Sequence, residues 1–176
     1  MRQVAMQLDQ TTITQGEFAV VERKGATIST VLGSCVATCL WDPDRGVGGM
    51  NHMLTTRSGF DPVGCDAVGV NAMELLINAL NRLGADRRRL RGKIFGGARM
   101  VSGLSDIGHT NGQFALEYLD REGIPCLGHS LGGTRARQVR FFPAEGRVLM
   151  RSVAPDRRIE APLSMPIPSG NAVELF

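Results

Sequence analysis

Short extended segments, separated by turns rich in glycine and proline, fill most of this chain, and only two long segments have helical periodicity. The first helical segment covers residues 70–84, with Asn71 as its expected cap. The second covers residues 111–123, with Asn111 as its expected cap. This pattern predicts an α+β fold, a layered sandwich of mostly antiparallel or mixed β-sheet with the two helices packed outside.

The extended segments include one long β-branched stretch, residues 26–41, which is interrupted at Gly33 and Ser34. The turn at residues 42–46 contains Pro43 and Gly46 and predicts a hairpin between this stretch and residues 47–55. The other expected strands are residues 16–25, 93–101 and 124–131, and a second hairpin at 137–153.

The chain has 176 residues, 43% of them hydrophobic, which is enough for one domain with a core of its own. We expect a single domain over residues 16–153. Residues 1–15 are polar and without a clear period, and predict a flexible lead-in. Residues 154–176 are rich in proline and predict a flexible tail.

The formal charge is only +3 and aromatic residues make up 5% of the chain, which argues against a nucleic-acid partner. The sequence has no run of about 18 apolar residues, so we expect no membrane insertion. The N-terminus lacks the apolar core of a signal peptide, which indicates a cytoplasmic protein. Its four cysteines should then be reduced thiols.

The first hairpin brings a cysteine and a histidine together. If Trp41 pairs with Gly46, Cys35 lies directly opposite His52, and directly opposed side chains share a face. A shift of one residue would put the two on opposite faces, so the expectation depends on the register. The sequence pattern by itself is also consistent with Cys35 being a small core residue that has no role in catalysis.

A thiol beside an imidazole can hydrolyse an amide. The thiolate attacks the carbonyl carbon, and the imidazole serves as general acid and then as general base. The backbone N–H groups of Gly33, Ser34 and Cys35 are candidates for stabilising the oxyanion, with Gly33 permitting the backbone angles that such a site needs.

The stretch LGSCVATCLWDPDRGVGGMNHML, residues 32–54, resembles the signature of the CheD family of chemoreceptor glutamine deamidases. The resemblance continues through KIFGGARM at residues 93–100 and through residues 107–141, and covers roughly residues 16–153. At His109 and Thr110 the family more often carries an acidic and a basic residue.

The resemblance implies a protein-glutamine glutaminase that converts receptor glutamine side chains to glutamate and ammonia through a thioester, without a cofactor. The nucleophile falls on Cys35 and the histidine on His52. The family threonine, six positions before the cysteine, falls on Ser29, with Thr30 beside it as the alternative. The implied fold is similar to that of bacterial toxins that deamidate host GTPases.

The implied partners are the cytoplasmic helices of methyl-accepting chemotaxis receptors and a CheC-type phosphatase. Hydrolysis of a receptor methyl ester would use the same machinery. The main alternative is a non-catalytic adaptor that keeps the receptor-binding surface and also docks a CheC-type phosphatase.

Three other motifs carry rival interpretations. The GHSLG motif at residues 128–132 matches a hydrolase nucleophile elbow, but no histidine follows His129, so a triad in the usual chain order is excluded. The cysteines and histidines lack the paired spacing of a zinc site. The arginine run at residues 87–91 is interpreted as a solvated face, with an acidic partner as the alternative.

Overall fold

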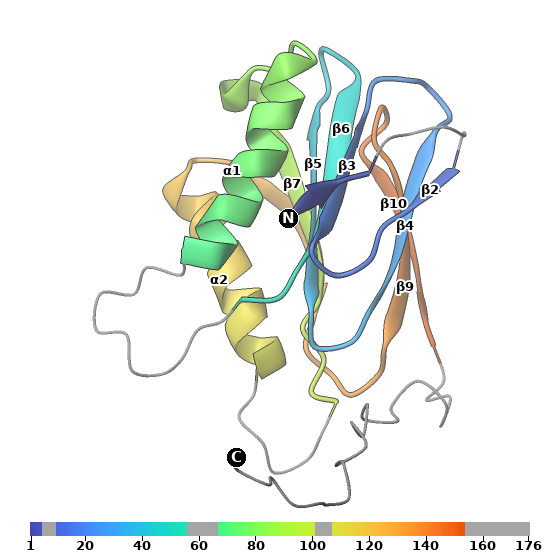
Figure 1. Ribbon diagram of the computed structural model, residues 1–176, viewed down its shortest axis with the longest axis vertical. Coiled ribbons are helices and arrows are strands. Elements are labelled where there is room, and N and C mark those ends of the chain that lie inside the picture. Colours follow the sequence, from blue (N-terminus) through green and yellow to red (C-terminus); the bar gives the residue numbers. More distant parts are fainter. Residues whose placement is uncertain (5–9, 56–66, 101–106, 154–176) are drawn as a thin grey trace, which may run out of the picture.

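Three layers make up the fold, as seen in the computed structural model: two helices, a six-stranded sheet and a four-stranded sheet (Figure 1). The structure describes residues 1–4, 10–55, 67–100 and 107–153. The expected α+β sandwich with both helices outside is confirmed. No helix among these residues has the length and apolar character needed to cross a membrane.

Both sheets are mixed, with mostly antiparallel neighbours. The larger sheet has the order β1 (Arg2–Gln3), β3 (Glu17–Val21), β6 (Val47–Met53), β5 (Val36–Asp42), β7 (Arg91–Gly96) and β8 (Cys126–Leu131). The smaller sheet has the order β10 (Arg147–Ser152), β9 (Arg137–Phe142), β4 (Thr27–Leu32) and β2 (Gln10–Thr12).

Two helices, α1 (Ala67–Arg82) and α2 (Ile107–Arg121), cover the outer face of the larger sheet (Figure 1). Both begin about one turn earlier than their periodicity suggested, so Asn71 and Asn111 lie inside the helices and cap neither. Asn71 is exposed, whereas Asn111 is fully buried.

The central strands β5 and β6 are buried on both faces, since all seven residues of each are buried. Val36 and Leu40 belong to the core beneath the helices, whereas Ala37, Cys39 and Trp41 belong to the core between the two sheets. Side chains of one strand therefore alternate between two separate cores.

The stretch 26–41 is two strands in two sheets, not one strand of a hairpin. It forms β4 in the smaller sheet and β5 in the larger one, and the chain crosses between them at residues 33–35. The interruption at Gly33 and Ser34 is thus part of the crossing, and it places Cys35 immediately before β5.

The described residues of the N-terminal segment, 1–4 and 10–15, belong to the domain, in contrast to the expected flexible lead-in. β1 pairs in parallel with β3, and β2 pairs in parallel with β4. Ile13 is 1% exposed in the core between the sheets. The N-terminal segment is therefore held against the two sheets by the burial of Ile13 and by two strand pairings, although its sequence has little periodicity. The expected tail, residues 154–176, lies outside the described residues.

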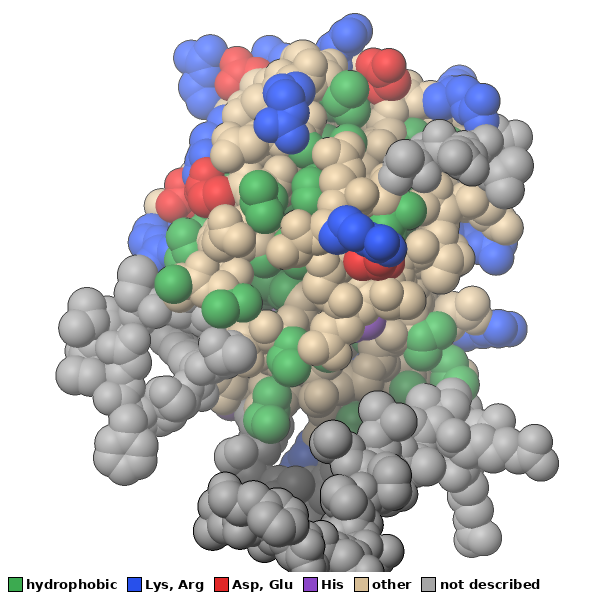
Figure 2. Space-filling view, viewed as in Figure 1, with side chains coloured by type: hydrophobic (Ala, Val, Ile, Leu, Met, Phe, Trp, Pro, Cys, Tyr) green, Lys and Arg blue, Asp and Glu red, His purple; other side chains and the backbone are tan. Residues whose placement is uncertain are grey.

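The arginine run forms structural ion pairs and is not a uniformly solvated face. Around the short 3-10 helix η1 (Arg87–Arg89), Arg87 binds Glu74 of α1 and Glu122, and Arg89 binds the fully buried Asp42 at the end of β5. Figure 2 shows acidic and basic side chains next to one another at this end of the molecule. These pairs connect the helices to the larger sheet.

Candidate functional site

The register of β5 and β6 places Cys35 and His52 on the same face. Ala37 pairs with His52, and Trp41 pairs with Gly48. The expected pairing of Trp41 with Gly46 was wrong by two residues, so Cys35 is diagonal to His52 and not directly opposite. Because side chains alternate with a period of two, the shift preserves the face.

The site lies in the space between the two sheets. Cys35 and Ala37 both belong to the core there, and His52 projects from β6 into the same layer, where it meets Thr30 of β4 in the opposite sheet. Cys35 is 9% exposed and His52 is 6% exposed.

Thr30 fixes the tautomer of the histidine. Thr30 Oγ1 donates to the backbone oxygen of Ile13 at 2.8 Å and lies 2.8 Å from His52 Nδ1. Since the single hydroxyl proton goes to Ile13, Nδ1 has to be the donor in the second contact. The neutral imidazole then carries its lone pair on Nε2, the nitrogen that a general base uses.

Ser29 lies on the opposite face of β4 from Thr30. It shares its side of the strand with Val31, which is 48% exposed, whereas Thr30 shares its side with the fully buried Ile28 and Leu32. Ser29 Oγ has no hydrogen-bond partner within the described part of the chain. The structure therefore brings Thr30 to His52, and Ser29 points away.

Burial favours the neutral forms of both Cys35 and His52. It lowers the pKa of His52 to about 4, against a smaller opposing effect of the Glu17 charge. Burial also raises the pKa of the Cys35 thiol. At neutral pH the site thus holds a thiol and a neutral imidazole, whereas the mechanism expected from the sequence begins with a thiolate.

Three consecutive carbonyl groups hold the loop that carries the cysteine. Gly33 O accepts from Ala98 N at 2.9 Å, and Cys35 O accepts from Gly97 N at 2.8 Å. Ser34 O accepts from Asn111 Nδ2 at 2.8 Å.

These bonds also orient the N–H groups of the loop. In a planar trans peptide the N–H points opposite to the C=O, so the Ser34 N–H faces away from Ala98, which follows β7, and the Cys35 N–H faces away from Asn111 of α2. Gly33 does not have a positive φ. A glycine is required instead at Gly96, because its backbone lies against the Cys35 carbonyl and an added Cβ would lie 2.2 Å from Cys35 O.

Sequence reasoning missed two residues of the site. Asn111 was taken for a cap, but its side chain links Ser34 O to Thr55 at the end of β6, accepting from Thr55 N at 2.9 Å. A polar residue within the apolar stripe of a helix was the available signal. The other is Gln15, whose Oε1 lies 3.6 Å from Cys35 Sγ, in a segment that we expected to be outside the domain.

The rival motifs do not form sites in the described residues. GHSLG lies in β8 and the residue that follows it, not at a strand-to-helix turn, so it is no nucleophile elbow. No group of three or more His, Cys, Asp or Glu that could hold a metal occurs within the described ranges. Cys39 is fully buried, Cys126 is half-buried, and Cys65 lies outside the described residues.

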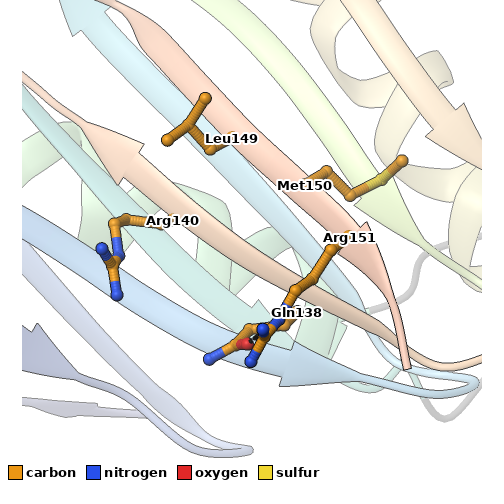
Figure 3. A pocket seen from close by; sticks show the side chains of 5 residues that line it. All are labelled: Gln138, Arg140, Leu149, Met150 and Arg151. Atoms are coloured by element: carbon orange, nitrogen blue, oxygen red, sulfur yellow. Dashed lines mark hydrogen bonds between the residues drawn. The ribbon is translucent and has the colours of Figure 1, made fainter. Parts of the chain in front are cut away.

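A surface pocket of about 260 Å³ lies away from the site. It is lined by residues of β9 and β10: Gln138, Arg140, Leu149, Met150 and Arg151 (Figure 3). Arg140 pairs with Ser29, and Gln138 with Val31, so this pocket is on the outer side of the smaller sheet. Thr30 and His52 are on its inner side.

Fold and site together define a class: a three-layer α+β protein that holds a cysteine thiol and a threonine-oriented imidazole between two sheets. A family model described as CheD, chemotactic sensory transduction, matches residues 65–152. The chain belongs to the CheD family, as the motif at residues 32–54 had indicated.

Similar proteins support this assignment over nearly the full length. A protein of Caulobacter vibrioides (strain NA1000 / CB15N) is 48% identical over 171 residues, covering 93% of this chain and 91% of its own. One of Rhizobium leguminosarum bv. trifolii (strain WSM2304) is 46% identical over 176 residues, covering 93% and 94%. Both are named probable chemoreceptor glutamine deamidase CheD.

Among solved structures, the Bacillus licheniformis hypothetical protein YfiH matches with a TM-score of 0.44 at 15% identity, covering 64% of this chain and 49% of that protein.

Proposed function

We propose that this chain is a cysteine-dependent protein-glutamine deamidase that acts in the cytoplasm on the helices of chemotaxis receptors. Cys35 is the nucleophile, His52 is the general base and acid, and Thr30 orients the imidazole. The observation that carries this assignment is the contact of Thr30 with His52 Nδ1, which leaves Nε2 as the basic nitrogen on the face that Cys35 shares.

The reaction begins from a neutral pair. As Cys35 Sγ attacks the amide carbon of the substrate glutamine, the thiol proton passes to His52 Nε2 and a carbon–sulfur bond forms. The N–H groups of Ser34 and Cys35 stabilise the oxyanion. Gly33 begins the crossing between the two sheets that carries these N–H groups. The carbon–nitrogen bond then breaks, and His52 gives its proton to the leaving nitrogen to form ammonia.

The second half of the reaction restores the enzyme. His52 Nε2 takes a proton from water, and the hydroxide oxygen bonds to the thioester carbon. The carbon–sulfur bond breaks, the proton returns to sulfur, and a glutamate side chain is released. All protons pass among the thiol, one imidazole nitrogen, the leaving nitrogen and water, so the residues of the site account for both halves of the reaction.

The test is mass spectrometry of a purified chemoreceptor cytoplasmic domain after incubation with the enzyme. Each deamidated glutamine gains about one dalton, because –OH replaces –NH₂. Cys35→Ala should abolish the gain, whereas Cys126→Ala, which removes a thiol in β8, should retain it. A gain that persists with Cys35→Ala would rule out the mechanism.

The same experiment separates the enzyme from a non-catalytic adaptor. An adaptor that binds receptors and docks a CheC-type phosphatase would retain receptor binding but produce no gain in mass. It would also have no requirement for Cys35 or His52. A CheC-type phosphatase remains a proposed partner of the enzyme.

A further inference from the structure

A glutamine side chain of the chain itself lies on the cysteine thiol. Cys35 Sγ donates to Gln15 Oε1 over 3.6 Å. Cys35 is buried, whereas Gln15 is exposed. We propose that Gln15 is an internal substrate analogue: its carboxamide occupies the subsite for the substrate carboxamide, and the substrate glutamine has to displace it. This inference rests on the proposed deamidase function.

The segment around Gln15 is anchored to the strands that build the site. Before Gln15, Ile13 N donates to Ser29 O at 2.9 Å, and Ile13 O accepts from Thr30. After it, Gly16 N donates to His52 O at 2.9 Å. The segment crosses from β2 in one sheet to β3 in the other (Figure 1). The backbone is therefore held on both sides of Gln15, and its exposed side chain can leave by rotation alone.

The orientation of the Gln15 carboxamide is not the reactive one. Its oxygen faces the sulfur and accepts the thiol proton. Attack requires the amide carbon to face the sulfur, with the oxygen turned toward oxyanion donors. In the state observed, the thiol proton is also directed to Gln15 and not to His52. Displacement of Gln15 frees both the subsite and this proton.

An internal competitor has a defined kinetic effect. It lowers the fraction of enzyme that is able to bind substrate, which raises the apparent KM by the reciprocal of that fraction. At saturating substrate the competitor is fully displaced, so kcat is unaffected. Removing the carboxamide should therefore lower KM and leave kcat unchanged.

The direct test is alkylation of Cys35 by iodoacetamide, measured by mass spectrometry of the cysteine peptides. Gln15→Ala should accelerate labelling of Cys35 by about 2-fold to 10-fold, the range expected for loss of one hydrogen bond. Gln10→Ala, an exposed glutamine in β2, is the matched control and should not. Labelling of Cys126 serves as an internal reference for an intact fold. An unchanged rate at Cys35 in Gln15→Ala overturns the proposal.

Kinetics with a receptor cytoplasmic domain distinguish the other roles of Gln15. A KM reduced by the same factor, with unchanged kcat, supports the analogue. A reduced kcat with unchanged KM means that Gln15 takes part in the chemistry. Conversion of Gln15 itself to glutamate in the wild type, absent in Cys35→Ala, means that it is a substrate. Both of these results overturn the proposal.

The alkylation rates require no turnover, so they remain informative if the receptor is not deamidated. Failure of the proposed function is a different result, namely receptor deamidation that persists in Cys35→Ala. The two failures are therefore distinguishable.

Discussion

Thr30 Oγ1 lies 2.8 Å from His52 Nδ1, and the two residues come from different sheets. The hydroxyl proton is committed to Ile13 O, so the threonine acts toward the histidine only as an acceptor. The tautomer that leaves Nε2 basic is therefore a consequence of packing one sheet on the other. Removal of this hydroxyl should affect catalysis without removal of any reacting atom.

The first prediction concerns this hydroxyl. Thr30→Val keeps the shape of the side chain and leaves the buried Nδ1–H unpaired, at a cost of about 1–3 kcal/mol. The loss raises the free energy of the tautomer that carries its proton on Nδ1, which is the tautomer used in the reaction. Receptor deamidation should therefore slow by roughly 10-fold to 100-fold. Thr30→Ser should restore most of the rate. Ser29→Ala should have little effect on kcat. A large loss in Ser29→Ala with none in Thr30→Val would reverse the assignment.

Part of this site was predictable from the sequence because strand periodicity is strict. The predicted register was wrong by two residues, but the prediction that Cys35 and His52 share a face was still correct. Only a shift by an odd number of residues moves a side chain to the other face. The choice between Ser29 and Thr30 was not predictable by the same rule. These residues lie in the other sheet, and their parity relative to Cys35 is lost where the chain crosses at residues 33–35.

The fold class followed from the number and spacing of the segments, but the membership of the two sheets did not. Local pattern gives no information on which strands pair across long separations. The N-terminal segment is the clearest example, because Ile13 and Gln15 receive their roles from contacts with Thr30 and Cys35. A polar stretch without periodicity was therefore taken for a lead-in.

The second prediction concerns Asn111, which links the cysteine loop to the end of β6. Asn111→Ala leaves Ser34 O and Thr55 N without their partner in a buried place, and should lower the free energy of unfolding by about 2–4 kcal/mol. The matched control is Asn71→Ala in the exposed part of α1. It should be neutral or slightly stabilising, because alanine is the better helix former. Urea denaturation measures both, and equal effects would contradict the assigned role.

The third prediction concerns the buried carboxylate of Asp42. Its burial raises its pKa, but bonds from Arg89 and from the N–H groups of Asp86, Arg45 and Asp44 outweigh burial and hold the pKa at about 2. Asp42→Asn should lower the free energy of unfolding by about 3 kcal/mol or more. Asp44→Asn, at an exposed position that also faces Arg89, should change it by less than about 1 kcal/mol. Similar losses in the two variants would contradict a buried structural pair.

The fourth prediction concerns the protonation of His52. Burial lowers its folded pKa to about 4, whereas an unfolded histidine titrates near 6.5. Between these values the unfolded chain binds the proton and the folded chain does not. Stability should therefore fall as the pH decreases from about 6.5 to about 4, by up to roughly 3 kcal/mol from this residue. Above about pH 6.5 the contribution is zero.

The window from about pH 5 to pH 6.5 isolates this effect, because the buried and paired carboxylates titrate at lower pH. Urea denaturation at several pH values in this window measures the slope, and His52→Gln should reduce it relative to the wild type. The imidazole signals in an NMR titration should place the midpoint of His52 near pH 4. A midpoint near 6.5, or an unchanged slope in His52→Gln, would mean that the imidazole is accessible to water. The resting pair would then be free to ionise, and the neutral starting state of the mechanism would have to be replaced by a thiolate and an imidazolium.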